Sequence, residues 1–204
     1  MNTLRKRIVF PLVVFVCVIG LGFAARKGAR ADESDKPDVI QIHLRDFCDP
    51  PTFNQAVGPG TCIGSGLMPF ATFLAELGEE KSVGEWRFNP NTIHVEEGTK
   101  LVLVNRGGET HTFTKVEEFG GGFVAPLNAP SGNPVPAPEC AQVLGDGSLV
   151  PQPAGPDNLF LEAGETEPGP TIGDGEKQTR FQCCVHPWMR LVVNHKHEEH
   201  QDHR

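Results

Sequence analysis

The alternation of apolar and polar residues predicts short β-strands over most of the chain from residue 86 onward. Between these segments lie Pro-Asn, Glu-Gly and Gly-Gly pairs, which are typical of turns. The strands predicted in this part cover residues 86–89, 92–96, 101–104, 110–115, 159–161, 180–183 and 191–193. Short strands, frequent turns and few helices favour an all-β Greek-key sandwich.

The region before residue 86 has a different pattern. Residues 39–44 alternate as in a strand, and residues 48–66 form a loop rich in Pro and Gly. Residues 67–77 carry apolar side chains at helical spacing, with Gly78 as a stop, so we predict a short helix that packs on the core. The expected division is an N-terminal extension at 32–85, the sandwich domain at 86–194 and a His-rich tail at 195–204.

Residues 118–158 are dominated by Gly, Pro, Ala and Asn. A featureless loop of this length is unusual inside a compact domain. We therefore predict a long Gly/Pro-rich insertion on the surface of the sandwich, held in place by Cys140.

The first 31 residues have the features of a secretory signal. Basic residues at positions 5–7 precede an uncharged apolar run at 8–23, and an Ala-Arg-Ala sequence follows at 29–31. The alternative is an uncleaved membrane anchor formed by residues 8–23, because basic residues at 26, 27 and 30 follow the apolar run. Either interpretation predicts that the protein lies outside the cytoplasm. It would be periplasmic or extracellular, or anchored to the outer face of the cytoplasmic membrane.

The charge of the chain changes when this leader is set apart. It holds six of the 18 Lys and Arg residues and none of the 26 Asp and Glu residues, which leaves a net charge of −14 on the rest. A strongly acidic domain argues against binding to nucleic acid or to anionic lipid surfaces. It is compatible with a basic protein partner or with simple solubility.

Five cysteines lie outside the leader: Cys48, Cys62, Cys140, Cys183 and Cys184. An oxidising compartment favours disulfides, and an odd number leaves one thiol over, which is either a liability or a ligand. Any four of them allow three pairings. A Cys48–Cys62 pair would close the Pro/Gly-rich loop and contribute roughly 3 kcal/mol.

The densest chemical cluster is the segment 183–189, which supplies a thiol, an imidazole and a thioether. Two His, one Cys and a weak axial Met define a blue-copper site. The second histidine is predicted to be His111, which follows a strand and a Gly-Gly corner. Cys183 is favoured over Cys184 because it shares a strand face with Phe181 and leaves room for a turn before His186. Cys184 is then available for a disulfide, with Cys140 as one candidate.

From about residue 86 to 193 the sequence resembles the cupredoxin family, of the plastocyanin and azurin type. The motifs are the run from Phe88 to Thr99, the Asn105-to-His111 corner and Cys183-x-x-His186. The resemblance implies one type 1 copper ion with four ligands: His111, Cys183, His186 and Met189. It also implies an exposed edge of His186, beside Pro187 and Trp188, as the electron exit. The step from His186 to Met189 is shorter than in plastocyanin, and residues 38–85 lie outside the resemblance.

A ligand set supplied entirely by the protein leaves no open position for a substrate, so the sequence predicts one-electron transfer with a redox protein partner and no enzyme activity. The alternative is copper storage or delivery to a partner, in which a tail containing His195, His197, His200 and His203 captures metal. An oxidase or reductase would need a second copper site, and outside the leader and tail only His43 and His94 remain for it.

Overall fold

A computed structural model describes residues 38–173 and 177–196 of the chain. The predicted signal or anchor at 1–31 and most of the predicted tail lie outside these residues. None of the helices in the described part is long and apolar enough to cross a membrane.

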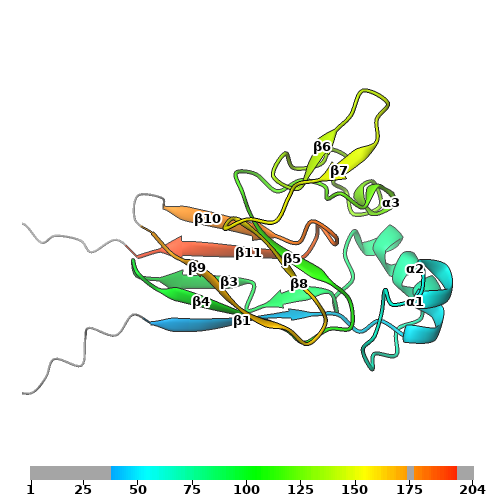
Figure 1. Cartoon of the computed structure of the whole chain (residues 1–204), viewed down its shortest axis with the longest axis horizontal. Coiled ribbons are helices and arrows are strands. Elements are labelled where there is room, and N and C mark those ends of the chain that lie inside the picture. The colour runs from blue at the N-terminus through cyan, green and yellow to red at the C-terminus, as the bar shows by residue number, and fades with distance from the viewer. Residues whose placement is uncertain (1–37, 174–176, 197–204) are drawn as a thin grey trace, which may run out of the picture. The chain divides into compact units, whose positions relative to one another are not determined.

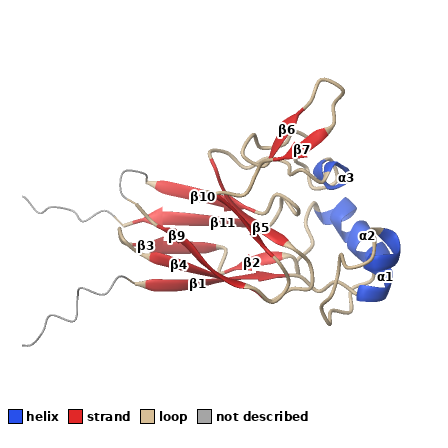
Figure 2. Ribbon diagram, in the orientation of Figure 1, coloured by secondary structure: helices blue, strands red, loops and turns tan. Residues whose placement is uncertain are grey.

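Two β-sheets form a sandwich (Figures 1 and 2). The first sheet runs in the order β2 (Arg87–Asn89), β1 (Val39–Arg45), β4 (Lys100–Asn105) and β9 (Thr166–Thr171). The second runs in the order β3 (Thr92–Val95), β11 (Arg190–His195), β10 (Gln178–Gln182), β5 (His111–Val116) and β8 (Asn158–Leu161). The pairs β1–β4 and β11–β3 are parallel and the others antiparallel. The predicted all-β sandwich is therefore confirmed.

The core lies between the two sheets and is built from every second residue of the strands. Phe113 on β5 stacks on Phe181 of β10 with ring centroids 4.4 Å apart, and Phe88 of β2 lies 5.4 Å from Phe113. Full burial of an apolar side chain of this kind contributes about 1.5–3 kcal/mol. The same alternation that predicted the strands thus supplies the apolar contact between the sheets.

Strand β1 belongs to the sandwich although its residues were predicted to form an extension. It lies between β2 and β4, and its inward residues Ile42 and Leu44 are fully buried. The sheet therefore begins at residue 39 and not at residue 86. Two helices separate β1 from β2 along the chain, so the local pattern gives no sign that these strands pair.

Helix α1 (Pro50–Ala56) occupies part of the segment predicted as a loop. The Asp49 side chain caps it by accepting a hydrogen bond from the Thr52 backbone N–H at 3.1 Å. Pro50 and Pro51 stand in the first turn, where the missing N–H groups would have no helical partner. The prolines that suggested a loop therefore start a helix.

Helix α2 (Phe70–Glu80) corresponds to the short helix predicted at 67–77. It begins after Pro69, which has an extended backbone, and it continues past Gly78 to a left-handed cap at Lys81. Phe73 and Leu77 face the core and are buried, as the helical spacing predicted. Helices α1 and α2 lie together at one end of the sandwich (Figure 1).

The predicted insertion at 118–158 contains structure of its own. It holds α3 (Ala125–Asn128) and a hairpin of β6 (Ala141–Val143) and β7 (Leu149–Pro151), which stands off the two sheets (Figure 1). A disulfide between Cys140 and Cys184 fastens the base of this hairpin to the segment after β10. Cys140 thus holds the insertion, as predicted.

Gly122 allows the insertion to lie directly against the chain at Cys184. The Phe123 N–H donates to the Cys184 carbonyl oxygen at 2.9 Å, and a Cβ at position 122 would overlap that carbonyl. We expect Gly122→Ala to lower the free energy of unfolding by about 1–3 kcal/mol, measured by urea denaturation. Gly145→Ala, where the added carbon meets open space, should stay within about 0.5 kcal/mol of the parent. Equal losses in the two variants would contradict this account of the packing.

Candidate metal centre

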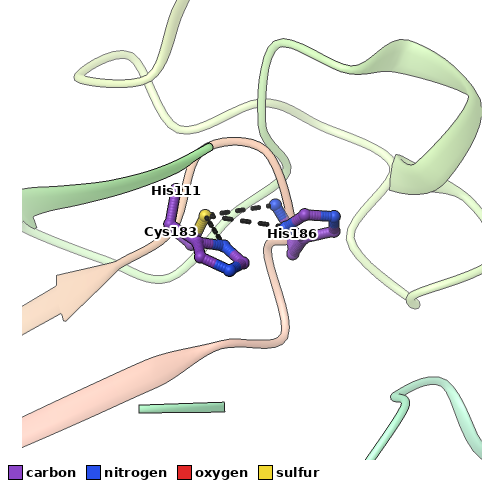
Figure 3. A group of neighbouring side chains, drawn as sticks. All are labelled: His111, Cys183 and His186. Atoms are coloured by element: carbon purple, nitrogen blue, oxygen red, sulfur yellow. Dashed lines mark hydrogen bonds between the residues drawn. The ribbon is translucent and has the colours of Figure 1, made fainter. Parts of the chain in front are cut away.

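Three of the four predicted ligands meet at one end of the sandwich (Figure 3). The Cys183 Sγ lies 3.8 Å from the His111 Nδ1 and 3.9 Å from the His186 Nδ1. One ligand atom from each residue falls within 4.8 Å of the others, and all three residues are buried. Positions separated by 72 residues in the sequence are thus brought into one group.

The pairing of β5 with β10 explains why these residues meet. The strands are antiparallel, so the start of β5 at His111 lies beside the end of β10, which Cys183 directly follows. The Thr112 N–H donates to the Cys183 Sγ at 3.4 Å, and the Thr112 hydroxyl accepts from the Cys184 N–H at 2.6 Å. The neighbouring strand therefore fixes the backbone on both sides of the thiol.

The loop from β10 to β11 supplies His186 and Met189. The His186 N–H donates to the Cys183 Sγ at 3.4 Å, the Met189 N–H donates to the His186 carbonyl at 2.9 Å, and the Cys183 N–H donates to the Met189 carbonyl at 3.0 Å. Met189 is fully buried in this closed loop. Its role as axial ligand stays a prediction.

Cys183 is the free cysteine of the described residues, and it is fully buried. The others form the disulfides Cys48–Cys62 and Cys140–Cys184. Both pairings were among the possibilities left open by the sequence. The disulfide at Cys184 also agrees with the choice of Cys183 as the ligand.

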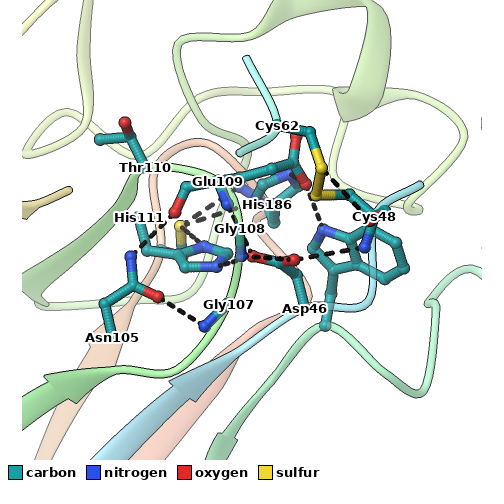
Figure 4. Close-up of polar contacts among 12 residues, drawn as sticks. Asp46, Cys48, Cys62, Asn105, Gly107, Gly108, Glu109, Thr110, His111 and His186 are labelled. Atoms are coloured by element: carbon teal, nitrogen blue, oxygen red, sulfur yellow. Dashed lines mark hydrogen bonds and ion pairs between the residues drawn. A yellow bond between two sulfur atoms is a disulfide. The ribbon is translucent and has the colours of Figure 1, made fainter. Parts of the chain in front are cut away.

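Two buried carboxylates that the sequence did not single out complete the group (Figure 4). Asp46 Oδ2 lies 2.9 Å from the His111 Nε2, and Glu109 Oε2 lies 3.5 Å from the His186 Nε2. Glu109 stands inside the Asn105-to-His111 corner, which was a signal that could have found it. Asp46 lies in the region that no motif covered, and its sequence context gives no such signal.

A dense set of backbone donors holds Asp46 in place. Its carboxylate accepts from the N–H groups of Gly108 at 2.9 Å, Glu109 at 3.0 Å and Cys48 at 3.3 Å. A Cβ on Gly107 would overlap this carboxylate, so the glycine at the corner is needed for the close approach of Asp46.

The mutual contacts shift the pKa values of these groups. Burial by itself would raise the pKa of Asp46, but the His111 ring and the corner N–H groups lower it to about 2. Burial would lower the pKa of His111, but its contacts with Asp46 and Cys183 raise it to about 10.

The pKa of the Cys183 thiol falls well below its usual value, because the two imidazoles outweigh burial. Burial raises the pKa of Glu109, against the opposing effects of His186 and the Trp86 N–H. The contacts of Cys183 with the two imidazoles therefore favour the thiolate form over the thiol.

The exposed edge expected for His186 is contradicted by the structure. His186 is only 2% exposed. Its ring centroid lies 5.4 Å from that of Trp188, 6.3 Å from that of Trp86 and 6.4 Å from that of Phe73. Phe73 comes from α2, in the part of the chain outside the cupredoxin resemblance. That region covers a ring edge that the resemblance alone placed at the surface.

The donor set fits a copper ion. A thiolate and two imidazoles are soft or intermediate ligands of the kind that copper prefers, and a buried thioether follows in the same loop. Both histidines turn Nδ1 toward the thiol and Nε2 toward a carboxylate. A proton held on each Nε2 leaves each Nδ1 lone pair available to a metal.

Among the solved structures that this chain resembles are a purple cupredoxin and amicyanin. A purple cupredoxin from Nitrosopumilus maritimus aligns with 13% identity over 76% of this chain and 98% of its own, with a TM-score of 0.36. A mutant of amicyanin in its reduced Cu(I) form aligns with 16% identity over 56% of this chain and 78% of its own, with a TM-score of 0.32. No family profile and no curated protein matches the sequence. Because these TM-scores are low, the assignment of a cupredoxin-like sandwich rests on the order and pairing of the strands.

The two disulfides should differ in their contribution to stability. The Cys140–Cys184 pair spans 44 residues and the Cys48–Cys62 pair spans 14. We expect Cys140→Ser with Cys184→Ser to lower the free energy of unfolding by about 2–4 kcal/mol, and by about 1 kcal/mol more than Cys48→Ser with Cys62→Ser. Urea denaturation of the metal-free proteins measures both values. A larger loss from the shorter loop would contradict the loop-closure argument.

Proposed function

We propose that this chain is an exported type 1 copper protein that transfers single electrons, with one copper ion held by His111, Cys183, His186 and Met189. The observation that carries the proposal is the buried convergence of two imidazole Nδ1 atoms on one free thiol. When bound, copper supplies one-electron chemistry by alternating between Cu(I) and Cu(II).

The residues around the thiol are suited to holding a charge and excluding water. Backbone N–H groups of Thr112 and His186 donate to the Cys183 Sγ, which stabilises a thiolate without adding a titrating group. His111 and Cys183 are 0% exposed. A ligand set that the protein supplies in full, with a buried thiol, leaves no open position on the metal for a substrate, which supports a carrier over an enzyme.

The surface near His186 supplies an approach for a redox protein partner. An apolar pocket between α1, α2 and α3 reaches His186 and Glu109, and Leu74 at its rim is 43% exposed. Phe73 contributes to the lining and also packs on the His186 ring. We place electron exchange through this aromatic cover, in place of the bare ring edge that the family resemblance implied.

Export is supported by the cysteines as well as by the leader. Two disulfides join the four cysteines other than Cys183 in the described part of the chain. Such bonds persist outside the cytoplasm, in a periplasmic or extracellular compartment. Membrane tethering through residues 8–23 remains the alternative to cleavage of the leader.

Copper storage or delivery is the alternative function. It depends on the tail, in which His195 is the one histidine within the described residues. His195 is the last residue of β11, and its Nε2 lies 2.8 Å from the Thr179 hydroxyl on the neighbouring strand β10. The buried ligands and the placement of His195 give more support to the carrier.

The visible spectrum of the full chain with one equivalent of Cu(II) tests the proposal. We expect an intense blue to purple thiolate band that is lost in Cys183→Ser, because Cys183 is the one free thiol among residues 38–173 and 177–196. The double variant Cys140→Ser with Cys184→Ser is the control and should keep the band. The predicted tail contains no cysteine, so it cannot produce a thiolate band. A colourless parent protein would contradict the copper assignment.

Competition with a chelator separates the carrier from the delivery protein. We expect the parent to hold copper against an excess of a strong chelator for hours in both oxidation states, because the ligands are buried. The measurement is the decay of the thiolate band for Cu(II) and of bound metal after gel filtration for Cu(I). Rapid transfer in either state would favour delivery.

A further inference from the structure

Each histidine of the proposed copper site contacts a buried carboxylate through the ring nitrogen remote from the thiol (Figure 4). The side chains of Asp46 and Glu109 are only 1% and 8% exposed. Charged carboxylates are rarely buried this deeply unless they are paired. The burial of one carboxylate beside each of the two proposed ligand rings therefore indicates that these carboxylates act on the rings.

Asp46 meets hydrogen-bond donors on both of its oxygens. Oδ1 accepts from Cys48 and Gly108, while Oδ2 accepts from Glu109 and lies 2.9 Å from the His111 Nε2. A carboxylate that accepts from several N–H groups is held in its charged form. The His111 ring is thus oriented by a fixed negative charge that is itself fastened to the Gly107–Gly108 corner.

Glu109 uses one oxygen for two contacts. Its Oε2 accepts from the Trp86 indole N–H at 2.7 Å and lies 3.5 Å from the His186 Nε2. Trp86 also packs near the His186 ring. The carboxylate therefore joins the ligand ring to the aromatic cover.

We infer that Asp46 and Glu109 are positioning residues that orient the two imidazole ligands and favour Cu(II) over Cu(I), which lowers the reduction potential. Negative charge on the remote ring nitrogen makes an imidazole a stronger donor to a metal. In a buried site the attraction is greater for an ion of higher charge. This inference rests on the proposed function, because it concerns the same copper site.

The test compares Glu109→Gln and Asp46→Asn with the parent protein. In Glu109→Gln the amide oxygen can stand where Oε2 stands and keep both contacts, so the variant removes charge with little change of shape. Asp46→Asn also places an amide donor among N–H groups, so it tests orientation together with charge. The control is Glu139→Gln, which makes the same substitution at a partly buried carboxylate that accepts from the Glu117 N–H.

The measurements are the Cu(II) and Cu(I) affinities by chelator competition, the potential by redox titration and the thermal midpoint. We expect Cu(II) affinity to fall about 10–100-fold in each site variant. Cu(I) affinity should change less, and each tenfold difference between the two states equals a rise in potential of about 59 mV. Glu139→Gln should leave the potential at the parent value. A merely structural role would lower the midpoint without separating the two oxidation states.

The outcomes distinguish a failure of the proposed copper site from a failure of the proposed role of Asp46 and Glu109. A parent protein without a thiolate band would overturn the copper site itself. A parent with that band, and a Glu109→Gln variant with unchanged potential and Cu(II) affinity, would overturn the positioning role alone. If Asp46→Asn does not fold, Glu109→Gln still decides whether the charge acts on the site.

Discussion

The contact between Asp46 and His111 joins the first strand of the sandwich to the candidate metal centre. Asp46 directly follows β1, and His111 begins β5 in the opposite sheet. The same carboxylate accepts from the corner that connects β4 to β5. Burial of this charge is tolerable only with all these donors present, so the arrangement of strand, corner and ring is fixed as one unit.

The remaining contacts of the site surround the buried sulfur of Cys183. Cys183 lies past the end of β10 and receives two backbone N–H groups, while the loop to β11 closes on itself through Met189. The helices between β1 and β2 then contribute aromatic rings over His186. The segment outside the family resemblance therefore helps to cover a ring edge that the resemblance alone placed at the surface.

Two disulfides fasten the irregular parts of the chain near the site. Cys48–Cys62 holds the segment around α1, and Cys140–Cys184 holds the base of the β6–β7 hairpin beside Cys183, the proposed ligand. Loops of this kind bury little apolar surface of their own, so covalent links to the sandwich offset the entropy of ordering them.

The sequence by itself determined the features that depend on local pattern. Alternation at 39–44 and 92–96 predicted strands because a sheet buries every second residue, and the apolar runs at 101–104 and 191–193 predicted strands buried in the sandwich. The spacing of Cys183 and His186 predicted a shared loop. It did not determine that β1 pairs with β4, that Pro50 starts a helix, or that Thr166–Thr171 forms the strand β9. Nor did it reveal Asp46 or the cover over His186, because both depend on contacts between segments far apart in the chain. The tertiary structure decided which side chains surround the thiol, since burial and hydrogen bonding are properties of the packed molecule.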